Sequence, residues 1–334
     1  MIDFRYHLVS LVSVFLALAV GIVLGAGPLK DSISDTLSNQ VEKLRQEKDT
    51  LRTNLDTATT GVTHRDDFIT DITPTLIAGQ LIGRQIVVLT LPGVDGDDVK
   101  PLTDGITAAG GTVTGQIDVR SGWIDPAKAT DRSALAAKLA ETVPEASGGG
   151  SAAGGDTSTQ LARFLADSIL TDTGSARGSI DSANVRESLK NEDLINIKGD
   201  LSALAGSALM LAPPNEAAVS GSVKPTADSN GEAAYLQLAS ALDGAGGGAV
   251  VTGPSSSAIG GGLLAAIRKS DPENKRISTV DSGSTAMGVV SAVLALREQV
   301  SGGVGQYGFG DGASQPLPTS SLVTATPAAT ATAR

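Results

Sequence analysis

The sequence predicts an α/β protein in three parts: an N-terminal transmembrane helix, a coiled-coil stalk, and a doubly wound, Rossmann-like domain with a mainly parallel sheet. Three observations predict this class. A stretch of 22 residues near the N-terminus has no charged side chain, an apolar heptad pattern follows it, and short apolar runs then alternate with helical patterns. The expected parts are a transmembrane helix at 1–29, a stalk at 30–65, an α/β domain at 80–302 with a flexible loop at 144–159, and a disordered tail at 303–334.

The first expected element is a membrane-spanning helix from Leu8 to Leu29, without Asp, Glu, Lys or Arg. At about 1.5 Å per residue, a helix of this length crosses the ~30 Å hydrocarbon layer of a bilayer. A cleaved signal peptide usually has a shorter apolar region and a small-residue cleavage site. Residues 25–27 are small, but Pro28 would follow the cut. We therefore expect the helix to be retained as an anchor in the lipid bilayer.

The charges around this helix do not decide its orientation. Arg5 precedes the apolar stretch, whereas Lys30 and further basic residues follow it. Long domains cross a membrane largely regardless of charge, so a short cytoplasmic tail and a long translocated domain form the simplest topology. This topology makes the chain a single-pass protein of the cell envelope with an extracytoplasmic α/β domain.

The expected stalk rests on apolar residues spaced alternately four and three apart, which is the heptad pattern of a coiled coil. Its predicted dimer seam consists of Leu37, Val41, Leu44, Lys48, Leu51 and Leu55, and continues to Ala58 and Val62. Lys48 is the one polar residue at an a position, and Glu47 at g can pair with Arg52 at e of a second copy in a parallel homodimer. From Lys30 to Val62 such a helix would reach about 50 Å. The alternative is an amphipathic helix folded back on the globular domain.

The expected α/β domain begins with a buried-strand pattern at 85–91, a Pro-Gly turn, a helix at 97–109 capped by Asp97, and a strand at 112–119. Such a unit implies a parallel strand pair. The further expected strands are 207–212, 248–252 and 277–280, and the further expected helices are 133–141, 160–170, 231–242, 262–269 and 284–300. Strands that alternate with helices favour a doubly wound sheet.

Composition argues against several functions. With 25 Lys and Arg against 36 Asp and Glu, the net charge of −11 disfavours nucleic acid as a partner. The chain has no cysteine and only two histidines, His7 and His64, which both lie outside the α/β domain. Because neither a nucleophile elbow nor a suitably placed base occurs, we expect no catalytic residue and no enzyme activity. Residues 303–308 match G-x-G-x-x-G by letters, but they follow a helix, so we expect a helix cap and no cofactor site.

No metal site is expected either. The cluster at Asp95, Asp97 and Asp98 lacks the calcium-loop spacing, and such residues satisfy backbone groups in turns and helix caps. His64, Asp66 and Asp67 at the end of the stalk are expected to form a solvated polar turn. Copper would need soft or imidazole ligands. The methionines (Met1, Met210 and Met287) and the two histidines form no cluster in the sequence.

The residues 1–25, MIDFRYHLVSLVSVFLALAVGIVLG, carry the most specific likeness to a known family. They strongly resemble the actinobacterial MctB family, named for mycobacterial copper transport protein B, which includes the cell-separation protein SteB. The likeness continues through the stalk, the strand and turn at 87–93, and Trp123 to Pro126. It ends at residues 303–308 (GVGQYG), where the family tends to close with a similar Gly-Tyr-Gly. It covers nearly the whole chain apart from the tail.

The resemblance implies two roles. One is copper transport or homeostasis across the cell envelope, and the family name implies the outer membrane. The alternative is a dimeric scaffold that regulates daughter-cell separation and peptidoglycan hydrolysis with a SteA-like membrane partner. A pore needs several spanning helices or a closed barrel, whereas the sequence shows one apolar helix. The predicted order of anchor, stalk and domain favours a scaffold that holds a partner at a set height.

Overall fold

The computed structural model describes residues 4–26, 28–142, 155–171, 181–215 and 229–319. Contacts divide the chain into two compact units, Met1–Arg65 and Asp66–Arg334. Most of the loop expected at 144–159 and the last fifteen residues of the expected tail lie outside the described residues.

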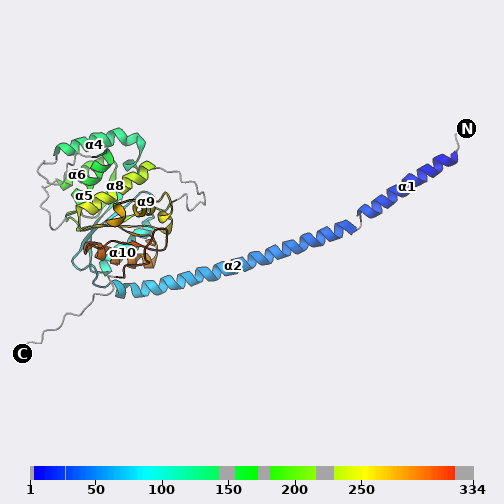
Figure 1. Cartoon of the computed structure of the whole chain (residues 1–334), viewed down its shortest axis with the longest axis horizontal. Helices are drawn as coiled ribbons and strands as arrows, with labels where there is room; N and C mark the ends of the chain where they lie inside the picture. The colour runs from blue at the N-terminus through cyan, green and yellow to red at the C-terminus, as the bar shows by residue number, and fades with distance from the viewer. Residues whose placement is uncertain (1–3, 27, 143–154, 172–180, 216–228, 320–334) are drawn as a thin grey trace, which may run out of the picture. The chain divides into compact units, whose positions relative to one another are not determined.

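The first unit is helical. Helix α1 spans Phe4–Ala26, and helix α2 begins at Pro28 and extends to Ile77 in the second unit (Figure 1). Residues Phe4–Gly25 form one helix that is long and apolar enough to cross a membrane, and none of it is buried within the protein. The expected N-terminal apolar helix is therefore present.

Helix α2 continues past the expected end of the stalk at residue 65. The polar turn expected at His64, Asp66 and Asp67 is wrong, because these residues lie within α2. No glycine or proline occurs between Gly61 and Pro74 to interrupt the helix, and apolar side chains continue its periodicity up to Ile77.

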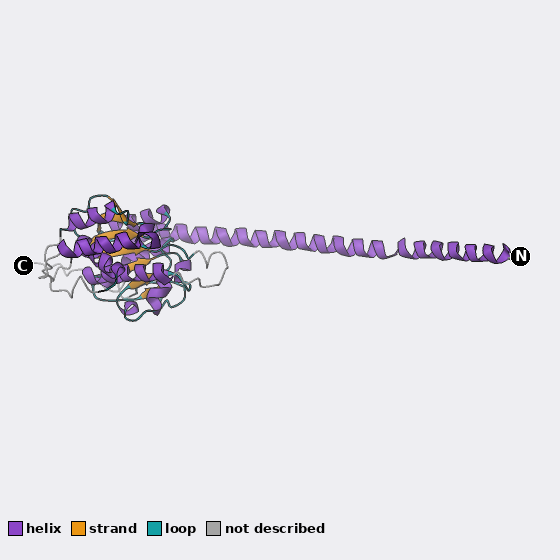
Figure 2. Ribbon diagram, turned by 90° about the horizontal axis from the view of Figure 1, so that it is seen from above, coloured by secondary structure: helices purple, strands orange, loops and turns teal. Residues whose placement is uncertain are grey.

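The second unit is built on one sheet. Within the described residues, seven strands follow the order β3-β2-β1-β4-β5-β6-β7, and Figure 2 shows them between layers of helices. Every neighbouring pair is parallel except β2 and β3, which are antiparallel at one edge. The expected mainly parallel sheet is confirmed. The strands are β1 (Gln85–Thr90), β2 (Thr112–Val119), β3 (Ile195–Lys198), β4 (Ser207–Leu211), β5 (Ala249–Thr252), β6 (Ser278–Val280) and β7 (Gln306–Tyr307).

Helices cover both faces of this sheet. One layer contains α4, α5, α6, α8 and α9, and the opposite layer contains α3 and α10 (Figure 1). The helices are α3 (Gly96–Ala108), α4 (Ala129–Thr142), α5 (Thr157–Ile169), α6 (Ser182–Asn191), α8 (Ser229–Ala245), α9 (Leu263–Lys269) and α10 (Ala286–Val300). Four 3-10 turns complete the described elements: η1 (Ser121–Trp123), η2 (Pro126–Lys128), η3 (Ser255–Ala258) and η4 (Glu273–Lys275).

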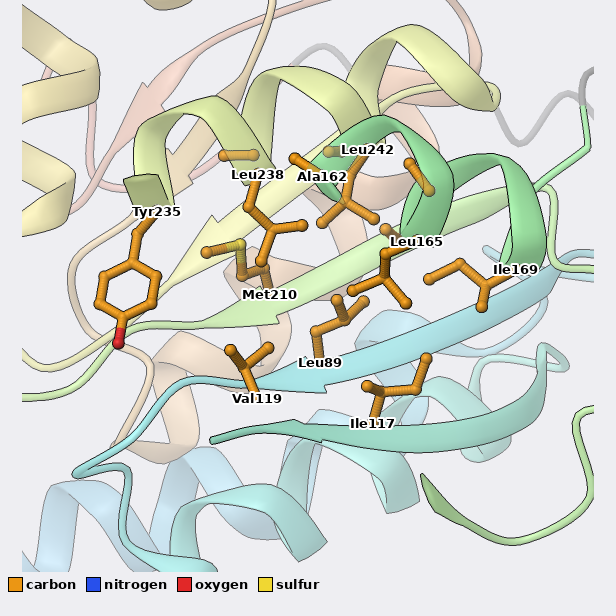
Figure 3. Close-up of a cluster of buried hydrophobic side chains, with 14 of the residues drawn as sticks. Leu89, Ile117, Val119, Ala162, Leu165, Ile169, Met210, Tyr235, Leu238 and Leu242 are labelled. Carbon is orange, nitrogen blue, oxygen red and sulfur yellow. The ribbon is translucent and has the colours of Figure 1, made fainter. Parts of the chain in front are cut away.

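Two apolar cores fill the spaces between sheet and helices. Leu89 of β1, Ile117 of β2 and Met210 of β4 point into the first core, towards Leu165 of α5 and Leu238 of α8 (Figure 3). Neighbouring residues along the same strands point into the second core beneath α3 and α10. Because side chains alternate along a strand, a strand buried on both faces is apolar almost throughout, as β4 is after Ser207.

The expected elements differ from the structure at several ends. Asp95 caps α3, because its carboxylate accepts the Asp97 backbone N–H at 3.1 Å, so Asp97 is not the cap. Helix α5 begins at Thr157, inside the loop expected at 144–159, where the Asp156 carboxylate accepts the Thr159 N–H. Helix α6 and strands β3 and β7 were not expected from the sequence.

The prediction that a disordered tail starts at residue 303 is wrong for the residues that the structure describes. Gln306 and Tyr307 form β7, which pairs in parallel with β6, and the Tyr307 side chain is buried in the second core. The backbone N–H of Ser314 also donates to the Gln306 carbonyl at 2.7 Å. Gln306 and Tyr307 therefore form the edge of the sheet, and the α/β fold continues beyond residue 302.

Candidate functional site

The predicted dimer seam lies on one exposed face of α2. A spacing of alternately four and three residues keeps side chains on the same side of a helix with 3.6 residues per turn. The apolar members are between 40% exposed (Val41) and 69% exposed (Leu51), and Lys48 is exposed among them. The six residues Leu37, Val41, Leu44, Lys48, Leu51 and Leu55 form a surface with no cover within the described chain.

Charged residues flank this seam. Lys43 and Glu47 are one helical turn apart, with 4.0 Å between Nζ and Oε1, and both side chains are largely exposed. An exposed pair of this kind contributes little to stability. Glu47 therefore stays available for a cation on a neighbouring helix.

A shallow cleft lies in the α/β domain at the carboxyl ends of β4 and β5. It is open to solvent and has room for about one water molecule, and its lining comes from α3, from Val94 before it, and from the segments that follow β4, β5 and β6. In open α/β sheets, ligands bind outside the carboxyl ends of the strands where the order reverses, here between β1 and β4. The lining residues are Val94, Asp98, Leu102, Leu211, Ala212, Thr252, Gly253, Pro254, Gly283 and Ser284.

Asp98 is the one ionisable residue in the lining of this cleft. Burial raises the pKa of its carboxyl, and the nearby Asp95 and Asp97 raise it further through repulsion between like charges. Because these three residues are acidic and no cationic residue among those described lines the cleft, the cleft is a poor site for an anion. A single carboxylate with small and apolar neighbours also gives no general acid and base pair.

Asp118, near the end of β2, has a pKa shifted in the opposite direction from that of Asp98. Burial would raise the pKa of this carboxyl, but hydrogen bonds from Lys198, Thr90, Gln116 and Asn196 outweigh it and lower the pKa. The Lys198 ammonium and the Thr90 hydroxyl each donate at 2.9 Å. All of these contacts come from β1, β2 and β3, so this cluster ties the antiparallel edge to the rest of the sheet.

The candidate metal ligands lie in different secondary-structure elements. His7 lies in α1 and His64 in α2, whereas Met210 is buried in β4 and Met287 lies in the first turn of α10. Among the residues that the structure describes, no group of three or more His, Cys, Asp or Glu side chains could hold a metal ion. Met1 lies outside the described residues.

The glycine-rich segment at 303–308 has a packing role. The Gly303 N–H donates to the Glu298 carbonyl at 2.9 Å, which ends α10. Gly308 has φ +127°, and a Cβ there would collide with the Asp281 carboxylate. The spacing of glycines thus serves a close approach between chain segments, and the expected exit from the domain is instead a strand.

The same segment is fixed by a buried ion pair that the sequence analysis did not predict. Arg268 of α9 and Asp281, just after β6, lie 2.9 Å apart between Nη1 and Oδ2. The guanidinium donates to the carbonyls of Tyr307 and Asp311, and the carboxylate accepts the N–H groups of Phe309 and Gly310. The hydrogen bonds of this ion pair therefore fix the position of the segment that follows β7.

The chain matches the family model described as "Copper transport outer membrane protein, MctB" over residues 1–318. The chain belongs to the MctB family. Proteins named "Copper transporter MctB" from Mycobacterium bovis and Mycobacterium tuberculosis are 27% identical over 325 residues, 94% of this chain and 98% of each of them. The protein of that name from Mycobacterium leprae is 28% identical over 322 residues.

Membership of the MctB family agrees with two features of the structure. The family match includes the apolar helix α1, and together they fit a membrane-anchored envelope protein. The family match ends at residue 318, next to the last described residue. The segment that Arg268 and Asp281 hold by hydrogen bonds therefore belongs to the MctB-type domain.

Proposed function

We propose that this protein supports copper homeostasis at the cell envelope as a membrane-anchored, dimeric and non-enzymatic member of the MctB family. One observation carries the proposal. The family match extends over residues 1–318, so the likeness to proteins named copper transporters includes the anchor, α2 and the α/β domain together.

The proposed arrangement has α1 in the bilayer, α2 as a coiled-coil stalk, and a Rossmann-like domain outside the cytoplasm. Two features support it. From Leu8 to Gly25, the side chains of α1 are exposed, uncharged and mostly apolar on every face, which suits lipid. The α2 seam leaves five large apolar side chains in water unless a second helix covers them.

We further propose that this chain acts on copper through a partner protein. Copper(I) prefers thiolate and thioether ligands. The chain has no cysteine and three methionines, and Met210 is packed in the core. The exposed seam is a surface for binding a protein, and neither the seam nor the small cleft at the strand ends contains a nucleophile paired with a base.

The second candidate is a scaffold that regulates daughter-cell separation and peptidoglycan hydrolysis with a SteA-like membrane partner. The same scarcity of copper ligands favours it. A stalk that holds a binding domain at a fixed distance from the membrane would suit either role.

The copper content of a deletion strain under copper load, measured by elemental mass spectrometry against its parent, separates the two candidates. We expect a clear rise that the full-length gene reverses. Unchanged copper, together with unseparated daughter cells, would overturn the copper proposal and support the scaffold.

A further inference from the structure

The seam spacing on α2 does not stop at Val62. The next positions four or three residues apart are Arg65, Ile69, Ile72 and Leu76, and all of them lie in the same continuous helix. Leu76 is 38% exposed, and Ile69 and Ile72 are partly exposed. The apolar row therefore continues from the first unit into the helical segment at the start of the second.

The core of the α/β domain does not fully bury this row: Ile69 and Ile72 are partly covered within the chain, and Leu76 remains 38% exposed. Ile77, the last residue of α2, is fully buried in the core beneath α3 and α10. In the described part of the chain, the partly buried apolar side chains that pack against this core are Val94, Val113 and Leu317. Ile69, Ile72 and Leu76 are not among them, although they precede Ile77 by only a few residues.

We infer that a second copy of this chain packs in parallel and in register along α2 from Leu37 to Leu76. This inference rests on the proposed dimer and extends it. In this register Pro74 occupies an f position, on the side away from the partner, and Gly61 occupies a g position beside the seam. The helix breakers thus avoid the a and d layers, which apolar residues fill except at Lys48 and Arg65.

Charge complementarity supports a second copy as the occupant. In a parallel pair, a residue at a lies beside g of the facing helix, and a residue at d lies beside e. Lys48 at a would lie beside Glu47 of the partner subunit, and Arg65 at d beside Asp66 of the partner subunit. Both cations in the seam would therefore meet a carboxylate.

The parallel orientation follows from the charges and the anchor. In an antiparallel pair, e positions face e positions, which would bring Arg45 and Arg52 of the two chains together. Two copies anchored through α1 in one bilayer would also run in the same direction. Because Ile77 is fixed in the domain core, the last seam layers would hold the two α/β domains close together.

Single-cysteine cross-linking in the full-length, membrane-embedded protein tests this inference, because the natural chain has no cysteine. Leu44→Cys, Ile72→Cys and Leu76→Cys occupy seam layers, and Asp67→Cys and Thr70→Cys are controls on the outer face of α2. Membranes would be oxidised with diamide and dimers scored on non-reducing gels. A disulfide needs Cα atoms about 4.4–6.8 Å apart, which identical a or d positions provide only in a parallel, in-register pair.

We expect the three seam variants to cross-link at least about tenfold faster than the two controls. If Leu44→Cys cross-links while Ile72→Cys and Leu76→Cys behave like the controls, the dimer stands and the extension to Leu76 is overturned. If Leu44→Cys also behaves like the controls, the proposed dimer fails and the inference fails with it. Trp123 fluorescence of the reduced variants checks that each domain is folded.

Discussion

The Arg268 guanidinium and the Asp281 carboxylate form an ion pair in which the side chains are only 2% and 1% exposed. Hydrogen bonds complete the pair: Arg268 also donates from Nε to the Thr279 hydroxyl at 2.9 Å, and Asp281 accepts two backbone N–H groups. A buried ion pair offsets its desolvation only when its remaining groups are also satisfied. Here these groups connect α9, β6 and the segment after β7.

Removal of the Asp281 carboxylate should therefore destabilise the domain strongly. Asp281→Ala leaves a buried, unpaired guanidinium and two unpaired N–H groups, and loss of one partner of such a pair costs about 3–5 kcal/mol. We expect a large fall in the urea midpoint, followed through the fluorescence of Trp123, the one tryptophan. Asp104→Ala is the control, because the Lys100–Asp104 pair is largely exposed; equal losses in the two variants would contradict a special role of the buried pair.

Gly308 should tolerate no side chain. Its φ of +127° is unfavourable for alanine, and the added Cβ would collide with the Asp281 carboxylate. Gly308→Ala should lower the urea midpoint more than Gly302→Ala, in which φ is +82° and no atom lies within 4 Å of the added Cβ. Both variants carry backbone strain, so the larger fall at Gly308 reports the collision together with its less favourable φ. Equal midpoints would show that the segment after β7 can move away from Asp281.

Asp98 and Asp118 should give the stability opposite dependences on pH. The raised pKa of Asp98 means that its contribution is fully present below about pH 4 and is lost as the pH rises through the folded-state pKa. The lowered pKa of Asp118 means that its contribution is present above about pH 4 and is lost as the pH falls through the folded-state pKa.

At pH 7, Asp98→Asn should thus raise the urea midpoint slightly, and Asp118→Asn should lower it. The Asp98 difference should shrink as the pH falls through its raised folded-state pKa, and the Asp118 difference should shrink as the pH falls from about 4 through its lowered folded-state pKa. Urea titrations at pH 7 and at lower pH values measure this directly. A midpoint that falls in both variants at pH 7 would show that the Asp98 carboxylate stabilises the domain.

The α2 seam should control the oligomeric state. Leu44→Asp with Leu51→Asp places four carboxylates in the two central d layers of a paired stalk, where like charges repel and apolar burial is lost. We expect monomers in sedimentation of the detergent-solubilised protein, whereas the wild type sediments as a dimer. Glu42→Ala and Asn54→Ala, outside the a and d layers, form the control. A double Asp variant that stays dimeric would show that the interface lies elsewhere.

The sequence predicts the strongly patterned elements well. Continuous apolar runs mark β1, β4 and β5, and the Pro-Gly turn after Leu91 separates β1 from α3. Strand β3 is missed because Ile195–Lys198 has four residues and a polar one between its two isoleucines. The helix expected at 30–65 ends too early, because Arg65 and its polar neighbours interrupt the apolar spacing that resumes at Ile69, Ile72 and Leu76.

Strand β7 is missed for a different reason. Gln306–Tyr307 is two residues long and lies among glycines, which read locally as a helix cap and a loop. Its position depends on Arg268 and Asp281, which are far away in the sequence and show no motif. The cleft could not be predicted from local sequence either, because its lining comes together only when four segments around the sheet are assembled.

The central claim is that an anchored dimer of this MctB-family chain supports copper homeostasis. Its most direct test is the copper content of the deletion strain under copper load, measured by elemental mass spectrometry after complementation with the wild type or with the Leu44→Asp, Leu51→Asp variant at equal membrane abundance. We predict that the wild type restores the parental copper content and the variant does not. Full restoration by a variant that sediments as a monomer would contradict the claim.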